Sequence, residues 1–344
     1  MQFNYINMKM RVAFIGQPEY FSFCYENELE HIGIWEIQSF NLNFFMTSND
    51  FIGLQEFNAD INIFFRGEFV PDEILMGLNG IKVNLSSEVF PKYVDGNLVF
   101  SLDSLNRYKH FIKSMRSKSF DYIFHYDRTS IRFMQEDNIF LSGEFQFPVA
   151  TETYQSYDIP EEWDFFFIGR STIHRDRFFN PLKHHYRFLH ICHGIWGSPL
   201  VPYMNRSKIL LNIHAENETS WEPRVQMLMA TGKMVISEKL SCNNYLIPGQ
   251  DYIEISSPVE LYQKAKYYLE NHEERLVIAE NGKKKVMDLL SSKKVFKQFF
   301  IDLTNNKYQR SNFTSLNARS AESRILRLRV RKMINNIIMM KMNR

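Results

Sequence analysis

Residues 207–237, SKILLNIHAENETSWEPRVQMLMATGKMVIS, decide the fold, because a strand, a loop, a helix and a second strand follow one another there. The apolar run at 209–214 predicts a buried strand, and a polar loop comes after it. Pro223 suits the first turn of a helix, and Gly232 suits the position just past its end. A second apolar run at 234–237 follows at once. Buried strands separated by helices predict a parallel sheet covered by helices.

The same alternation extends over the second half of the chain. Apolar runs at 165–168, 188–192 and 252–255 predict three more buried strands. A helix is expected to start at the sequence Ser-Pro-Val-Glu (257–260), which is a capping box with proline at the first helical position. Residues 273–303 are interpreted as further helix.

The first half repeats this pattern. Apolar runs at 11–15, 61–65, 81–85 and 122–124 each end in polar residues, where ligands bind in parallel sheets. A polar stretch flanked by proline at 148–160 breaks the pattern and is expected to be the linker between two domains. With 344 residues, we predict an N-terminal Rossmann-like domain over 1–150, a C-terminal one over 151–305, and a tail over 306–344.

Composition is that of a globular protein, with 44% hydrophobic and 23% charged residues. No uncharged apolar run reaches the roughly 18 residues of a membrane span, and the first residues show no export signal, so we expect a cytoplasmic protein. Zinc-finger spacing, an RNP motif and a broad basic stripe are all missing from the sequence, which therefore does not indicate nucleic-acid binding.

The tail differs from the rest of the chain in charge. Residues 310–344 hold nine Lys or Arg and one acidic residue, whereas the preceding residues hold 32 basic and 38 acidic ones. Within 324–344, apolar residues recur at helical spacing and most basic residues fall outside that stripe. This basic amphipathic helix is typical of a segment on an anionic membrane surface, but it equally fits packing on the protein or on a second subunit.

Two loops are candidates for binding an anionic ligand. The first presents Glu218, Glu222 and Arg224 at a helix N-terminus beyond the strand that contains Asn212 and His214. The alternative is that Glu222 caps this helix and Arg224 pairs on its surface. The second loop follows the strand at 165–168 and places Gly169, Arg170 and Arg175 where they could neutralise a diphosphate. Its alternative is a solvated surface turn.

These pieces resemble the donor domain of GT-B glycosyltransferases, and in particular the CgeB-like branch related to the family 1 and 4 enzymes. The pieces that match in order are FIGR (167–170), SKILLNI (207–213), EPR to ATG (222–232), PGQDYIEI (248–255) and the helix from 258. The resemblance covers about 140 residues and is loose in the first half. It implies two Rossmann-like domains with parallel sheets facing across a cleft, plus C-terminal helices.

The resemblance also implies site residues. Arg170 and Arg175 would contact the diphosphate of a nucleotide-sugar, and Glu222 and Arg224 would lie near the ribose and the sugar. The whole expected donor site consists of Gly169, Arg170, Arg175, Asn212, His214, Glu218, Glu222 and Arg224.

One position departs from the family pattern. Related enzymes carry a glutamate that holds the ribose five residues before the glycine ending this helix, and here Met227 stands there. The earlier acid of the same pattern falls on Thr219. Methionine is a poor hydrogen-bond acceptor, so either Glu218 or Glu222 replaces the glutamate, or donor binding is weakened or lost.

The sequence indicates no cofactor and no metal. It contains no DxD motif, which bridges a metal to the diphosphate in the other major glycosyltransferase fold, so arginines and a helix dipole would neutralise the charge. The sequence also lacks a Walker A motif and GxGxxG, which argues against an NTPase or a dehydrogenase.

A general base should come from the polar ends of the first set of strands. The candidates are Glu88, His125 and Asp127, each of which could instead be a cap or a surface residue.

We therefore expect a metal-independent glycosyltransferase that uses a nucleotide-sugar donor and a glycan, lipid-linked or other cell-envelope acceptor, on the inner face of the membrane if the tail binds lipid. The main alternative is a degenerate GT-B scaffold that binds a glycan or an assembly partner without turnover. A Rossmann-type epimerase is a third possibility.

Overall fold

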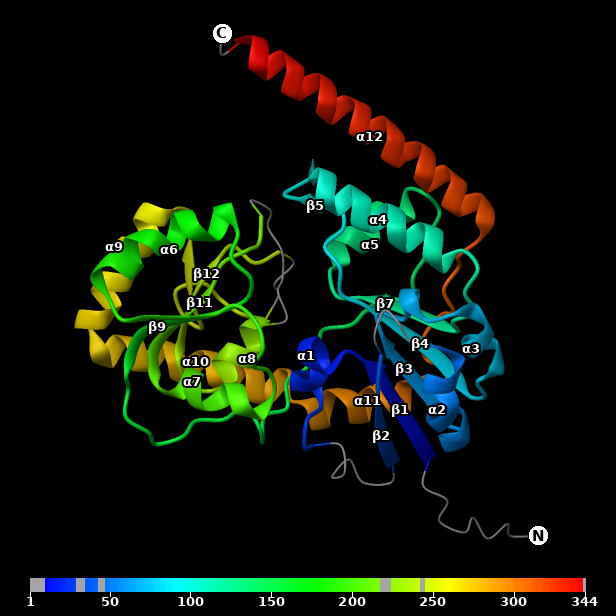
Figure 1. Ribbon diagram of the computed structural model, residues 1–344, viewed down its shortest axis with the longest axis horizontal. Helices are drawn as coiled ribbons and strands as arrows, with labels where there is room; N and C mark the ends of the chain where they lie inside the picture. The colour runs from blue at the N-terminus through cyan, green and yellow to red at the C-terminus, as the bar shows by residue number, and fades with distance from the viewer. Residues whose placement is uncertain (1–9, 29–34, 43–46, 217–223, 242–244, 343–344) are drawn as a thin grey trace. The chain divides into compact units, whose positions relative to one another are not determined.

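The computed structural model describes residues 10–28, 35–42, 47–216, 224–241 and 245–342 (Figure 1). The chain divides into two compact α/β units, each assembled from separate segments. The first comprises Met1–Gly16, Trp35–Phe145 and Asn306–Arg344, and the second comprises Gln17–Ile34 and Gln146–Asn305.

The first unit contains a six-stranded parallel sheet in the order β2-β1-β3-β4-β7-β8. Its strands are β1 (Met10–Gly16), β2 (Trp35–Asn41), β3 (Ile61–Phe65), β4 (Ile81–Ser86), β7 (Tyr122–His125) and β8 (Gly143–Glu144). A two-stranded antiparallel hairpin joins β5 (Lys92–Val94) to β6 (Asn97–Val99). Asp95 and Gly96 form its turn with positive φ of 49° and 79°, as expected of an Asp-Gly hairpin.

The helices of the first unit pack their apolar residues around this sheet. They are η3 (Ser48–Phe51), α2 (Ile52–Phe57), η4 (Gly67–Phe69), α3 (Asp72–Gly77), α4 (Leu102–Met115), α5 (Arg128–Gln135) and α12 (Ser315–Met342). Ala13, Phe64, Leu105 and Phe133 belong to one buried cluster that also contains residues of α12. Figure 1 shows α12 running beside α4, so the chain's last helix is part of this unit's core.

The second unit contains a five-stranded parallel sheet in the order β10-β9-β11-β12-β13. Its strands are β9 (Trp163–Ile168), β10 (Phe188–Ile191), β11 (Ser207–Asn212), β12 (Met234–Glu238) and β13 (Ile253–Ile255). Its helices are α1 (Pro18–Phe21), η1 (Ser22–Cys24), α6 (Ile173–His185), η5 (Ser198–Leu200), α7 (Val201–Asn205), α8 (Arg224–Ala230), α9 (Pro258–Glu270), α10 (His272–Leu289) and α11 (Ser292–Thr304).

The predicted parallel α/β fold is confirmed, because every apolar run named above coincides with a strand to within two residues and the strands of both sheets pair in parallel. The predicted capping box also forms: the Ser257 hydroxyl accepts a bond from the Glu260 backbone N–H at 3.2 Å. Strand β2 was not predicted, since its sequence WEIQSFN mixes polar and apolar residues and it lies at a sheet edge. No described helix is both long enough and apolar enough to cross a membrane.

The segment at 148–160 lies within the second unit. Val149 and Ala150 are fully buried, and their N–H groups donate to the carbonyls of Leu290 and Phe23 at 2.9 Å and 2.7 Å. The backbone entering the second sheet is therefore fixed on helices from both ends of that unit's sequence.

Candidate donor site

The carboxyl ends of β9, β11 and β12 lie at one edge of the second sheet, because these neighbouring strands are parallel. Gly169 follows β9 with φ +137°. A Cβ atom there would lie 2.9 Å from Arg224 Nη1 and 3.3 Å from Arg175 Nη1. Glycine is therefore required here both by the backbone and by the two guanidinium groups that approach it.

Arg175 lies in the first turn of α6 and is turned inward, with only 4% of its surface exposed. Its Nε donates to the Ile213 carbonyl at 3.0 Å and its Nη1 to the Arg170 carbonyl at 2.8 Å. Its guanidinium also lies over the Phe167 ring, 4.9 Å from the centroid. Through these contacts Arg175 connects the segments that follow β9 and β11.

Arg224 is the first residue of α8, and its guanidinium also approaches the Phe167 ring. Its Nε and Nη2 both donate to Asn212 Oδ1, at 3.1 Å and 3.0 Å, and its Nη1 donates to the Ile168 carbonyl at 2.7 Å. Its guanidinium too lies 4.9 Å from the Phe167 centroid. Two guanidinium groups thus share one aromatic ring at this edge, an arrangement worth about 0.5–2 kcal/mol per cation–π contact.

Asn212 is buried and continues this network toward β12. Its Nδ2 donates to Ser237 Oγ at 2.8 Å, and Ser237 Oγ donates to the Glu238 carbonyl at 2.6 Å. Both the Oδ1 and the Nδ2 of Asn212 therefore form hydrogen bonds inside the protein, so this side chain orients Arg224.

A histidine and carboxylate pair lies beside the network. His174 Nε2 is 2.9 Å from Glu238 Oε1, and Glu238 Oε2 accepts from the His214 backbone N–H at 2.7 Å. His214 is buried, and its Nε2 donates to the Lys239 carbonyl at 2.9 Å. Glu238 therefore links the first turn of α6 to the end of β11.

Arg170 differs from the other two arginines because its side chain is exposed and makes no hydrogen bond or ion pair with any residue in the described ranges. Next to it, α6 begins with Thr172 as its N-cap, whose hydroxyl accepts from the Arg175 N–H at 3.2 Å. A free cation beside the N-terminus of a 13-residue helix attracts anions.

The structure thus brings together six residues expected for a donor site, at one sheet edge: Gly169, Arg170, Arg175, Asn212, His214 and Arg224. Glu218, Glu222 and Thr219 lie outside the described residues. Met227 lies in α8 with 7% of its surface exposed. Sequence reasoning missed Glu238 and Ser237, although both end an apolar run that was identified as a strand.

The three candidate bases lie in the first unit. Glu88 is half-buried, its Oε1 is 2.6 Å from Arg66 Nη1, and its Oε2 pairs with Arg107. It is therefore held between two cations.

His125 is fully buried at the end of β7. Its Nδ1 lies 3.2 Å from Ser86 Oγ, its ring stacks on Phe90, and its Nε2 has no partner in the described part of the chain. Burial, followed by the nearby Lys92 charge, lowers the pKa of His125 to about 3, so the ring is neutral at physiological pH.

Asp127 is fully buried and pairs with Lys92 at 2.7 Å. It is also the N-cap of α5, where its Oδ1 accepts from the Thr129 N–H at 2.9 Å. Burial alone would raise its pKa, but the Lys92 charge and these hydrogen bonds lower the pKa to about 2. Asp127 and His125 expose no surface, whereas Glu88 does.

Within the described ranges, no three His, Cys, Asp or Glu side chains are grouped so that they could hold a metal ion.

Comparisons with known proteins agree with this geometry. Residues 171–300, inside the second unit, match the family model described as "Glycosyl transferase-like", which supports a glycosyltransferase. A comparison with curated protein sequences found no match.

Solved structures of GT-B glycosyltransferases are similar to the chain over most of its length. HepE of Anabaena in complex with UDP and glucose is 10% identical, with a TM-score of 0.55 over 86% of this chain and 100% of that chain. The same coverage and identity hold for sucrose-phosphate synthase of Thermosynechococcus elongatus, with a TM-score of 0.54. They hold as well for an alpha-glucosyltransferase in complex with UDP and a DNA 13-mer containing an HMU base, with a TM-score of 0.57. The fold is GT-B.

Proposed function

We propose that this protein transfers a sugar from a nucleotide-sugar donor, bound at the carboxyl edge of β9, β11 and β12, to a glycan or other cell-envelope acceptor. The observation that carries the proposal is the free Arg170 side chain, at the N-terminus of α6 and beside the fixed Arg175 and Arg224 guanidinium groups. A diphosphate is the group in such a donor that these positive charges would bind.

The two inner arginines support anion binding without touching the ligand. The hydrogen bonds described above, to carbonyl and amide oxygens, hold the two guanidinium groups in place at this edge. Their positive charge would act over several ångströms there and add to the helix dipole of α6. Arg170, whose side chain is exposed, would make the direct charge-assisted bonds to phosphate.

In this proposal the leaving nucleoside diphosphate is stabilised by protein charges rather than by a metal. As the sugar–phosphate bond breaks, negative charge grows on the phosphate oxygen, and Arg170 and the first-turn amides of α6 would stabilise it. HepE and the alpha-glucosyltransferase were both solved in complex with UDP, so a UDP-sugar is the first donor to try. We extend the proposal to the CgeB-like branch on the order and spacing of its sequence pieces.

A base near the acceptor hydroxyl remains a prediction. Among Glu88, His125 and Asp127, Glu88 alone exposes surface, so Glu88 is the member of this set that an acceptor could reach. The burial of the other two suits packing and helix capping in the first unit.

The competing proposal is a GT-B scaffold that binds a glycan or assembly partner without turnover. Met227 favours it, because a thioether in α8 replaces the carboxylate that would hold a ribose hydroxyl.

An assay of turnover separates these two proposals. The purified protein is incubated with UDP-, GDP-, ADP- and dTDP-sugars, with and without envelope glycan extracts, and the released nucleoside diphosphate and glycan mass are measured. Sugar transfer that is retained in the presence of EDTA and lost in Arg170→Ala supports the transferase. Nucleotide-independent glycan binding without any diphosphate release establishes the scaffold instead.

A lipid-linked or envelope acceptor would bring the protein to a membrane surface. We therefore include a peripheral membrane location in the proposal, which the basic amphipathic sequence of α12 supports.

A further inference from the structure

Helix α12 has two different apolar faces. Ala318, Ala321, Ile325 and Leu328 are buried and belong to the core of the first unit, next to α4. Their spacing of three to four residues puts them on one side of the helix. This face accounts for the attachment of α12 to its own unit.

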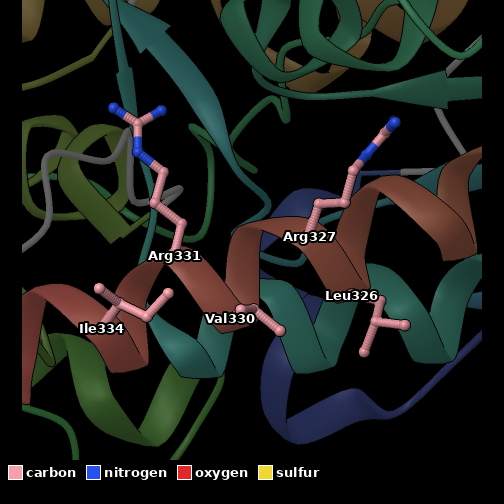
Figure 2. Close-up of a pocket in the computed structure, with 5 residues that line it drawn as sticks. All are labelled: Leu326, Arg327, Val330, Arg331 and Ile334. Carbon is pink, nitrogen blue, oxygen red and sulfur yellow. The ribbon is translucent and has the colours of Figure 1, made fainter.

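The second face carries apolar side chains that this unit does not cover. Leu326, Val330 and Ile334 follow at intervals of four residues and are 63%, 47% and 50% exposed, and Met333 and Ile338 lie near them on the helix. Together these five residues form what we call the α12 stripe. Leu326, Val330 and Ile334 line a pocket with Arg327 and Arg331, whose side chains both extend away from the helix along one flank (Figure 2).

The basic residues of α12 divide into two groups. Arg324, Arg329 and Lys332 engage the first unit: Arg324 pairs with Asp137 at 3.2 Å and also with Glu136, Arg329 bonds Asn106, and Lys332 lies over the Phe100 ring. Arg327 and Arg331 are exposed and form no ion pair within the described ranges. Their charges are therefore available to an external partner.

We propose that the α12 stripe is a docking surface for an anionic lipid bilayer, with Leu326, Val330 and Ile334 entering the interface and Arg327 and Arg331 binding lipid headgroups. Apolar side chains flanked by long cationic ones match a surface with an apolar interior and negative headgroups.

Charge favours lipid over a second copy of the chain. From residue 323 to 344 the sequence holds seven Lys or Arg and no Asp or Glu. Pairing two stripes would place Arg327 and Arg331 of both copies together with no acidic residue on the stripe to offset them. An anionic bilayer offsets the same charges.

The expected strength of membrane binding follows from the contributions of the arginines and of the apolar side chains. An arginine near an anionic surface is worth about a fivefold gain in partitioning, so removing both arginines should weaken binding roughly 30-fold. Leu326 and Ile334, each still about half exposed, should contribute about fivefold apiece.

The test measures sedimentation of the full-length protein with vesicles of phosphatidylcholine alone or of equal parts phosphatidylcholine and phosphatidylglycerol, without donor or acceptor. Variants are Arg327→Gln/Arg331→Gln and Leu326→Ser/Ile334→Ser. The matched control is Lys266→Gln/Lys297→Gln, which removes two exposed charges from the second unit. Point variants are used because a deletion of α12 would remove part of the core.

We expect binding to the phosphatidylglycerol vesicles that both stripe variants weaken and the control retains, and that high salt reduces. Equal binding of the wild type and both stripe variants, or no binding to anionic vesicles, would overturn the proposal. So would a concentration-dependent dimer in light scattering that Leu326→Ser/Ile334→Ser abolishes, since a second copy would then cover the stripe. Nucleotide binding is measured separately, so failure here leaves the proposed transfer activity unaffected.

Discussion

The buried pair of Lys92 and Asp127 gives the sharpest test of how the first unit is held together. The two groups are 2.7 Å apart, and their residues are 1% and 0% exposed. In Lys92→Met the aliphatic volume remains but the charge is lost, which leaves a buried carboxylate without its cation. Breaking such a pair from one side costs about 3–5 kcal/mol. The free energy of unfolding of the first unit should fall by that amount.

A double variant restores electrical neutrality at this buried site. Asp127→Asn in the Lys92→Met background leaves no buried charge, while an asparagine side chain can still accept the Thr129 N–H as an N-cap. We expect the double variant to recover most of the loss and to remain within about 2 kcal/mol of the wild type.

Hydrogen exchange at β7 amides in rising urea reports the stability of this unit separately from the other. Lys109→Met, at an exposed lysine of α4, is the matched control and should change stability by less than about 0.5 kcal/mol. A loss below about 1 kcal/mol in Lys92→Met, or a double variant less stable than Lys92→Met alone, would refute the reasoning.

Three further predictions concern His125, Asp127 and Gly169. His125 stays neutral when folded, with a pKa of about 3, but binds a proton below pH 6.5 when unfolded, so the first unit should lose about 2 kcal/mol between pH 6.5 and 4.5. Urea unfolding at several pH values checks this, and His125→Phe should remove the slope. Asp127, with a pKa lowered to about 2, contributes about 2 kcal/mol of stability that is present above pH 4 and lost as the pH falls toward 2. The urea midpoint measured at several acidic pH values should show this loss in the wild type and not in Asp127→Asn. Gly169→Ala should destabilise the second unit and weaken nucleotide binding because its Cβ displaces Arg224, whereas Gly194→Ala, also at positive φ but with no atom within 4 Å, should affect stability alone in a melting assay.

The sequence predicted the inner strands of both sheets well because these are short apolar runs that a parallel sheet buries on both faces, whereas the polar and apolar mixture of the edge strand β2 hid it. It could not predict β8, which is two residues long and pairs at an edge through Phe124 and His125. Nor could it predict where α12 lies, since a helix with two apolar faces gives the same periodicity whichever face is buried.

The candidate site shows a similar division. The sequence correctly predicted that Gly169 and Arg170 follow a strand at the sheet edge, whereas Arg175, expected in the same loop, lies buried in the first turn of α6. Which arginine turns inward depends on carbonyls from another strand, such as that of Ile213, and no local pattern encodes this. The same rule placed His125 at a strand end but carries no information on its burial under Phe90.

Calorimetric titration of UDP, GDP, CMP, ADP, dTDP and their sugars into the wild type, Arg170→Ala and Arg177→Ala tests the donor site most directly. Arg177 is the matched control because it is a second exposed arginine seven residues further along the chain. We expect one nucleotide class to bind, with affinity about 10- to 100-fold weaker in Arg170→Ala and unchanged in Arg177→Ala. A folded wild type that binds none of these ligands, or an Arg170→Ala variant that binds as tightly as the wild type, would contradict a donor site at this edge.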